Sequence, residues 1–131
     1  MSRAMFIGRW QPFHNGHKWL IGQKLDRGIP VLIAVRDVRP DEKNPLTTGQ
    51  TVEILTKMYE GADVEIIVIP DIESVNIGRR VGYEVNEFEP PPEIGGISAT
   101  EIRSDLAAGS DRWKSNVDAK IHELVARHFG F

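Results

Sequence analysis

The sequence predicts an α/β fold in which helices cover both faces of a parallel sheet and the chain ends in helices. Three short apolar runs, residues 4–8, 30–35 and 64–70, alternate with two segments of helical periodicity. Strands that alternate with helices form parallel sheets joined by right-handed crossovers. The chain has 131 residues, the usual size of one domain, and we expect residues 1–131 to form it.

The first strand and its helix are expected in the N-terminal part of the chain. Residues 4–8, AMFIG, are apolar and few, as in a buried strand. A helix from 16 to about 27 follows, because His17, Ile21 and Leu25 recur every four residues. A glycine and a proline then end this helix.

The next unit is a strand, a helix and a strand. Residues 30–35, PVLIAV, are continuously aliphatic, as in a parallel strand covered on both faces. A helix from 47 to about 60 begins at a capping box formed by Thr47 and Gln50. Residues 64–70, VEIIVIP, predict a third buried strand.

The pattern changes after the third strand. We expect short strands at 74–77 and 83–87, followed by an extended loop at the prolines 90–92. Ser98 and Glu101 form a second capping box, which opens a helix to about residue 108. A final amphipathic helix is expected over 116–129, with Val117, Ile121, Leu124 and Val125 on its apolar face.

The composition argues against several classes of function. The chain has no cysteine, which excludes disulfides and cysteine-ligated zinc. Its net charge of −3 gives no general attraction to nucleic acid. No apolar run reaches membrane-spanning length, and no signal-peptide pattern opens the chain. We therefore expect a cytoplasmic protein that binds small molecules and neither nucleic acid nor membranes.

The turn after the first strand is the first candidate site. In open parallel sheets, ligands bind beyond the carboxyl ends of the strands, where the strand order reverses. A helix that begins near Asn15 would present free amides and the positive end of its dipole to an anion. Gly16 lets an anion approach the backbone, and His14 and His17 can present imidazoles to a phosphate chain. The candidates of this turn are Gly8, Arg9, Gln11, His14, Gly16, His17 and Lys18.

Two other roles for the histidines have less support. His17 lies in line with Ile21 and Leu25, so it could be a core histidine. An H-x-x-H pair without cysteine, and without the glutamate of H-E-x-x-H, is a poor metal signature. The basic neighbours of the pair favour an anion site, and we predict no metal bound by the protein itself.

A second candidate site lies in ISATEIR, residues 97–103. Ser98 and Thr100 supply hydroxyls and amides at a helix start, and Arg103 lies one turn further on. Alone, this is an ordinary capping box with a surface arginine. Together with the first site, it predicts two helix N-termini that hold a triphosphate between them. The candidate contacts are Ile97, Ser98, Thr100 and Arg103.

These two stretches carry a resemblance to a known family. GRWQPFHNGH and ISATEIR resemble the signatures of the nucleotidylyltransferase superfamily, an H-x-G-H loop and an I-S-x-T-x-x-R helix start. The form G-R-x-Q-P-F-H-x-G-H is most similar to the archaeal type of nicotinamide-nucleotide adenylyltransferase. NPLTTGQTVEIL and GISATEIRSDLAAGSDRW are similar to further segments of that family. The resemblance covers residues 4–60 and 94–128.

The resemblance implies a Rossmann-like domain and a reaction. A nucleoside monophosphate would pass from a nucleoside triphosphate to a small phosphorylated acceptor, with release of pyrophosphate. In the family, the second histidine contacts the α-phosphate and the first helps to hold the triphosphate, which correspond to His17 and His14. The phosphate contacts of the second motif map to Ser98, Thr100 and Arg103. Mg²⁺ would be held mainly by the phosphates and water, and a homo-oligomer is expected by resemblance.

The substrates are a separate question. The Arg9-Trp10-Gln11-Pro12 form favours ATP, with nicotinamide mononucleotide as a candidate acceptor. A CTP-dependent cytidylyltransferase that acts on a small phosphate ester, such as glycerol phosphate, is an alternative that suits the chain length. A non-catalytic nucleotide-binding module on the same fold is an alternative from another class.

The chain also departs from the family pattern. Thr51 stands where the family has an arginine, so Arg36 or Lys43 would have to supply that charge. About 26 residues separate Pro70 from Ile97, fewer than in the family, where this segment helps to build the nicotinamide pocket. The candidates for the acceptor side are Trp10, Asp37, Lys43, Asn76, Arg79 and Arg80.

Overall fold

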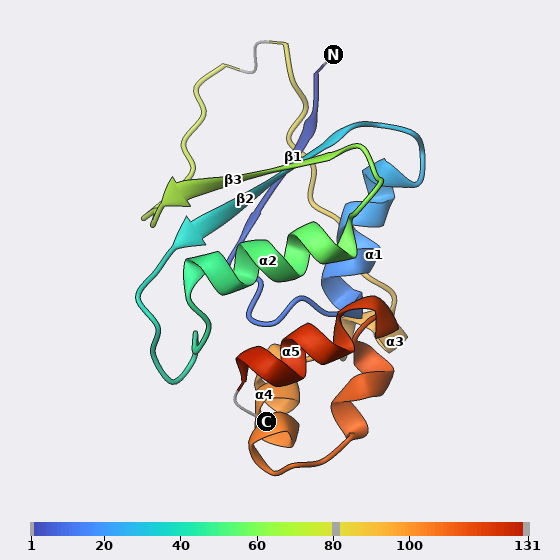
Figure 1. The fold of residues 1–131 in the computed structure, drawn as a ribbon. Helices are drawn as coiled ribbons and strands as arrows, with labels where there is room; N and C mark the ends of the chain where they lie inside the picture. Colours follow the sequence, from blue (N-terminus) through green and yellow to red (C-terminus); the bar gives the residue numbers. More distant parts are fainter. Residues whose placement is uncertain (1, 80–81, 130–131) are drawn as a thin grey trace.

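The computed structural model describes residues 2–79 and 82–129. Its sheet has three parallel strands in the order β1 (Ala4–Gly8), β2 (Val31–Asp37) and β3 (Val64–Pro70) (Figure 1). In the register, Ala4 lies opposite Val31, and Val31 lies opposite Val64. The three predicted strands are therefore confirmed, and β2 runs two residues beyond the predicted end.

Two helices connect the strands, as predicted. Helix α1 spans Asn15–Leu25 and helix α2 spans Thr48–Met58. The capping box of α2 is present, because the Thr47 side chain accepts from the Gln50 amide and the Gln50 side chain accepts from the Thr47 amide. These local bonds satisfy amides that a helix N-terminus otherwise leaves without partners.

The predicted α/β, Rossmann-like fold with a helical C-terminus is confirmed, with helices α1 and α2 on one face of the sheet and not on both. With strands in sequential order, right-handed crossovers place α1 and α2 on the same side. The core contains strand residues of that face, such as Phe6, Ile33 and Val35. On the opposite face, Ile7 is half-buried and Met5 is 56% exposed. Figure 1 shows the helices gathered on one side. The described strands also contain no reversal of strand order.

The segment after β3 differs from the prediction. Neither 74–77 nor the described residues 83–87 form a strand, and their apolar side chains, including Val75 and Tyr83, are exposed. A strand needs a partner for its backbone groups, and within the described residues no strand pairs with these segments. The chain then forms a short helix, α3 (Pro92–Gly95), where an extended loop was expected, because proline is well suited to the first position of a helix.

The C-terminal region packs beneath α1 and α2 (Figure 1). Helix α4 spans Ala99–Ala107, and the Ser98 hydroxyl accepts from the Glu101 amide at 3.3 Å. The second bond of the predicted capping box would run from the Ser98 amide to the Glu101 side chain. It is not among the hydrogen bonds of the described residues. The predicted single helix over 116–129 is wrong: the chain forms two short 3₁₀ helices and then α5. These elements are η1 (Arg112–Asn116), η2 (Ala119–Ile121) and α5 (His122–His128).

The break in the last helix has a local cause. Val117 is extended, with φ −131° and ψ 136°, and the Asp118 side chain accepts from the Lys120 amide. Aspartate that bonds to a backbone amide two residues ahead favours a turn over a continued helix. The predicted apolar residues Val117, Ile121 and Val125 are nevertheless buried. Within residues 2–79 and 82–129, no helix has the length and apolarity needed to cross a membrane.

Candidate functional site

The loop between β1 and α1 is built on a buried tryptophan. Trp10 has a positive φ of 56°, is 3% exposed, and donates from Nε1 to the Ala34 carbonyl at 3.3 Å. Its ring fills the space beside Gly8, where a Cβ atom would lie 2.9 Å from the ring. Trp10 is therefore a buried residue on which the loop packs. Its burial does not favour the role predicted for it, which was to stack on a ring of the ligand.

The two histidines form the N-terminal cap of α1. His14 Nδ1 accepts from the Gly16 amide at 3.0 Å, and His17 Nδ1 accepts from the His14 amide at 3.2 Å. The two rings stack with centroids 3.8 Å apart. The edge of the Trp10 ring system packs against His17 at 4.8 Å between centroids. His14, His17 and Trp10 are thus packed against one another in this loop.

Gly16 is required by the same geometry. A Cβ atom on Gly16 would lie 2.8 Å from the His14 imidazole. Because His14 folds back over the first turn to cap it, the residue between the two imidazoles needs to be small. The spacing His-x-Gly-His is therefore a packing requirement of a histidine cap.

The hydrogen bonds determine which ring nitrogen carries the proton. A nitrogen that accepts from a backbone amide is unprotonated, so the neutral ring carries its proton on Nε2. Burial lowers the pKa of His14 to about 4. Burial, and then the adjacent His14, lower the pKa of His17 to about 3. Near pH 7 both rings are therefore neutral and each has one Nε2–H donor that the cap does not use.

Arg103 joins the second motif to the first. Its Nη1 donates to the Gln11 carbonyl at 2.8 Å, and its Nη2 donates to Thr100 Oγ1 at 3.3 Å. Burial lowers its pKa, and the carboxylate of Asp41 opposes this shift. The contact across 92 residues places the N-terminus of α4 beside the loop that carries the histidines.

A further loop, residues 38–46, packs against the loop between β1 and α1. Gln11 Nε2 donates to the Leu46 carbonyl at 3.1 Å, and Gln11 Oε1 accepts from the Leu46 amide at 2.9 Å. Gln11 is 5% exposed, so both ends of its amide are engaged inside the protein. The geometry gives Gln11 the role of holding two loops together. Its predicted contact with phosphate remains a prediction for this position.

Asp41 is a member of the site that the sequence analysis missed. The amides of Asn44 and Lys43 donate to Asp41 Oδ1 at 2.7 and 2.9 Å. These bonds, with the Asn44 amide first and the charge of Arg9 among the smaller causes, lower the pKa of Asp41. The charge of Arg9 acts on the Asp41 carboxylate, and this carboxylate in turn opposes the lowering of the pKa of Arg103 by burial. The signal in the sequence was an aspartate three residues before an asparagine, a common turn pattern.

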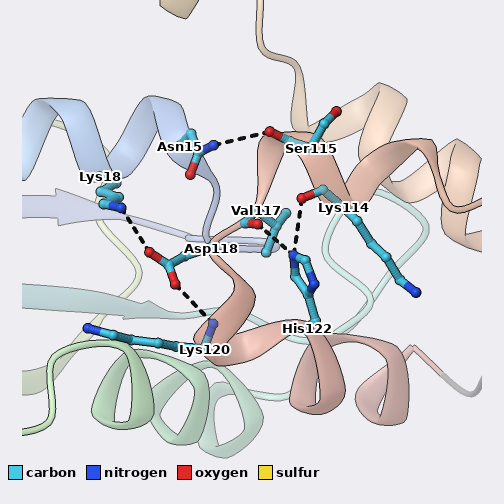
Figure 2. A network of polar contacts seen from close by, with 8 residues as sticks. All are labelled: Asn15, Lys18, Lys114, Ser115, Val117, Asp118, Lys120 and His122. Carbon is cyan, nitrogen blue, oxygen red and sulfur yellow. Dashed lines mark hydrogen bonds and ion pairs between the residues drawn. The ribbon is translucent and has the colours of Figure 1, made fainter.

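Lys18 forms an ion pair with the C-terminal region. Its Nζ lies 2.8 Å from Asp118 Oδ2, and the neighbouring Asn15 donates to the Ser115 carbonyl at 3.3 Å (Figure 2). Both partners lie in the C-terminal region. The predicted phosphate contact of Lys18 therefore competes with an ion pair, which the sequence did not predict.

The candidates for the acceptor side lie in two places. Asp37, at the end of β2, accepts from Thr48 Oγ1 at 2.8 Å beside a cleft of about 440 Å³. Asn76 and Arg79 lie in the exposed segment after β3. Arg80 lies outside the described residues. The cleft is lined by Asp37, Val38, Arg39, Pro40, Thr47, Thr48 and Gly49.

The segment after β3 contacts the far end of α1. Glu84, a few residues beyond Arg79, lies 3.8 Å from Lys24 in the last turn of α1. That turn is at the opposite end of α1 from His14. A larger cleft of about 670 Å³ between α4 and η1 is lined by Glu101, Ser104, Asp105, Asp111, Arg112, Ser115 and Asn116, a set too acidic to favour a triphosphate.

Thr51 stands where the family pattern has an arginine. Thr51 is buried on α2 and its hydroxyl oxygen has no hydrogen-bond partner among the described residues. Arg36 is engaged elsewhere, because its Nη2 lies 2.6 Å from Asp71 and donates to the Ile72 carbonyl. Lys43 is exposed and is the better of the two predicted substitutes.

Comparisons with known proteins point to one family. No protein-family model matches the chain. The chain is 30% identical to the nicotinamide-nucleotide adenylyltransferase of Methanolobus tindarius over 153 residues, which cover 95% of the chain and 88% of that protein. It is 29% identical to the protein of the same name from Ignicoccus hospitalis over 157 residues, with 94% and 90% coverage. Both alignments are longer than the chain, so these relatives contain segments that it lacks.

Proposed function

Because the chain belongs to the nicotinamide-nucleotide adenylyltransferase family, we propose that it transfers the adenylyl group of ATP to the phosphate of nicotinamide mononucleotide and releases pyrophosphate. The observation that carries this proposal is the Arg103–Gln11 contact at 2.8 Å. It joins two helix N-termini, one with neutral imidazoles and one with hydroxyls. Such a pair suits a triphosphate, because free amides and helix dipoles both favour anions. We further propose that residues 1–131 act as one domain.

The reaction needs few groups of the protein. An oxygen of the acceptor phosphate attacks the α-phosphorus of ATP, the bond to the oxygen that bridges the α and β positions breaks, and pyrophosphate leaves. The attacking oxygen is already anionic near neutral pH, so no base has to remove a proton. Catalysis then consists of positioning and of stabilising the charge at the transferred phosphoryl group.

The histidines are the proposed catalytic residues. Their Nε2–H groups donate to the phosphate oxygens, His17 at the α-phosphate and His14 further along the chain of phosphates. Because each Nδ1 is fixed by a backbone amide, the donors need no reorientation when charge develops. Neutral donors are sufficient here, since Arg103 and Arg9 supply the positive charge.

The remaining candidates bind the nucleotide. Ser98 and Thr100 offer hydroxyls and amides at the start of α4, while Gly8, Gly16 and Ile97 offer backbone groups. Lys18 reaches the phosphates only if its ion pair with Asp118 opens. Asp37 and Lys43 are the proposed acceptor-side contacts with the best placement, because Asp37 precedes the loop that Gln11 holds and Lys43 lies within it.

Magnesium fits this site as an ion bound to ATP. Within the described residues, no group of three or more His, Cys, Asp or Glu side chains could hold a metal ion. Phosphate oxygens and water would therefore provide its ligands, as magnesium prefers. Bound in this way, it would add positive charge near the departing pyrophosphate.

A pyrophosphate-release assay tests the proposal. The purified chain is incubated with magnesium and either ATP or CTP, and each is paired with nicotinamide mononucleotide or glycerol phosphate. We expect release with ATP and nicotinamide mononucleotide, and formation of the dinucleotide. Release with CTP and glycerol phosphate alone would overturn the adenylyl assignment. Calorimetric binding of ATP without turnover of any acceptor would identify a non-catalytic binding module.

A further inference from the structure

A polar network ties the C-terminal region to the first turn of α1. Asn15 and Lys18 lie three residues apart and so share one side of the helix. Asn15 Nδ2 donates to the Ser115 carbonyl at 3.3 Å, and Lys18 Nζ donates to Asp118 Oδ2 at 2.8 Å (Figure 2). The turn that carries the histidines is thus held from a segment 100 residues away in the chain.

The carboxylate at the centre of this network is itself fixed. Asp118 Oδ1 accepts from the Lys120 amide at 2.9 Å, so its two oxygens bond in two directions. The Asp118 side chain is 16% exposed. The hydrogen bond from Lys18 is the largest cause that lowers the pKa of Asp118, so the carboxylate is charged near neutral pH.

The backbone around Asp118 is held by a histidine. His122 Nε2 lies 3.1 Å from the Lys114 carbonyl and 2.6 Å from the Val117 carbonyl (Figure 2). The ring also packs edge-on against the buried Trp113, with centroids 5.2 Å apart. Segment 114–118 is therefore fixed in place by its contacts with His122. The Asp118 carboxylate is thus attached to a held backbone and not to an exposed loop.

Helix α1 needs such a support. Ile21 is its one fully buried residue, and its first turn packs on the core through the ring of His17, so the side with Asn15 and Lys18 is held by the polar network. The reacting phosphate requires its donors in place, and a misplacement of about 1 Å can cost on the order of 100-fold in rate. The imidazoles lie on the same turn as Asn15 and Lys18, and any tilt of that turn moves both Nε2–H groups.

We propose that Asp118 is a positioning residue, which acts through Lys18 to fix the first turn of α1 and thereby the donors of His14 and His17. This inference rests on the proposed function. The competing account makes Lys18 a phosphate ligand that Asp118 merely holds back. The two accounts predict opposite effects when the charge of Asp118 is removed.

The decisive variant is Asp118→Asn. Asparagine keeps an oxygen for the Lys120 amide and is an equally good capping residue, so the backbone is preserved. The positioning role predicts that kcat falls about three- to tenfold while KM for ATP changes less than about twofold. Lys18→Met should produce a similar loss, the double variant should lose little more, and Lys18→Arg should recover most of the activity.

The control is Lys120→Ala. Lys120 contacts Asp118 through its backbone amide, its exposed side chain makes no hydrogen bond among the described residues, and its charge is the smallest of the influences that lower the pKa of Asp118. This variant also removes one positive charge, and we expect its kcat to equal that of the wild type. A kcat for Asp118→Asn that is unchanged or raised, or a lowered KM for ATP, would overturn the proposal and identify Lys18 as a ligand.

A spectroscopic measurement separates this inference from the proposed function. In the unliganded protein labelled with ¹⁵N at histidine, the ring nitrogens of His14 and His17 should show the Nε2–H form. In Asp118→Asn, we expect these signals to broaden or shift toward a mixture of tautomers, while those of His128 do not change. Identical ring signals in both proteins would refute the positioning role, even if the wild type released no pyrophosphate.

Discussion

Replacing His17 tests the core of the proposed mechanism. His17→Ala removes the Nε2–H donor proposed for the α-phosphate. The loss of one pre-positioned donor typically costs about 10²- to 10³-fold in kcat, or about 2.7–4 kcal/mol. The same change removes the acceptor for the His14 amide and a ring stacked at 3.8 Å. A lost helix cap costs about 1 kcal/mol, which corresponds to a fall in Tm of about 3–5 °C.

A second variant separates the two effects. In His17→Asn, the side-chain oxygen lies as many bonds from Cα as Nδ1, so it can still accept from the His14 amide. It has no group at the position of Nε2. We therefore expect a loss of kcat as large as that of the alanine variant, with a Tm closer to that of the wild type.

The assay is pyrophosphate release at saturating ATP, with Tm measured by calorimetry on the same preparations. His128→Ala is the control, because His128 lies at the end of α5 and contacts Glu53 at 3.0 Å. Its kcat should match that of the wild type. A His17→Asn enzyme that retains more than about a fifth of the wild-type kcat would refute the role of the Nε2–H donor.

Three further predictions concern stability. His14→Asn keeps the cap for the Gly16 amide but removes an imidazole whose pKa is lowered to about 4. The unfolded chain binds a proton below about pH 6.5 and the folded imidazole does not, so wild-type stability falls as pH drops from 6.5 toward 4. Between pH 7 and pH 5, the free energy of unfolding of the variant should fall by about 2 kcal/mol less than that of the wild type. Denaturant titrations at both pH values measure this difference, and equal falls would contradict the lowered pKa. Gln11→Leu leaves the buried amide and carbonyl of Leu46 without partners, and we expect a loss of about 2–4 kcal/mol in urea unfolding; a loss below about 0.5 kcal/mol would show that this contact is dispensable. Gly8→Ala places a Cβ atom 2.9 Å from the Trp10 ring. The free energy of unfolding should fall by about 1–3 kcal/mol, and the near-UV circular dichroism of the tryptophans should change. An unchanged spectrum and Tm would mean that the ring has room to move.

Local hydrogen bonding explains which parts of the fold were predictable. The three strands follow from continuous apolar runs, and α2 begins where Thr47 and Gln50 form their capping box. The histidine cap of α1 follows the same logic, because all of its bonds join residues within three positions of one another. Interactions of this kind depend only on residues close together in the chain, so they can be predicted from the sequence.

The errors have the opposite origin. The predicted final helix ignored Asp118, whose side chain bonds to the Lys120 amide and breaks the helical run. The predicted strands after β3 had apolar residues such as Val75 but no neighbouring strand to pair with. The coverage of the sheet depends on the strand order, which no single segment encodes.

By itself, the sequence predicted the three strands of the sheet, the starts of α1, α2 and α4, and the two motifs proposed to bind phosphate. The tertiary structure alone decided how these parts meet: Arg103 reaches the Gln11 carbonyl across 92 positions, and Lys18 reaches Asp118 across 100. The structure also showed that the Trp10 ring is buried beside His17. The physical reason is that packing and long-range polar contacts depend on the whole fold, whereas capping and apolar periodicity act within a few residues.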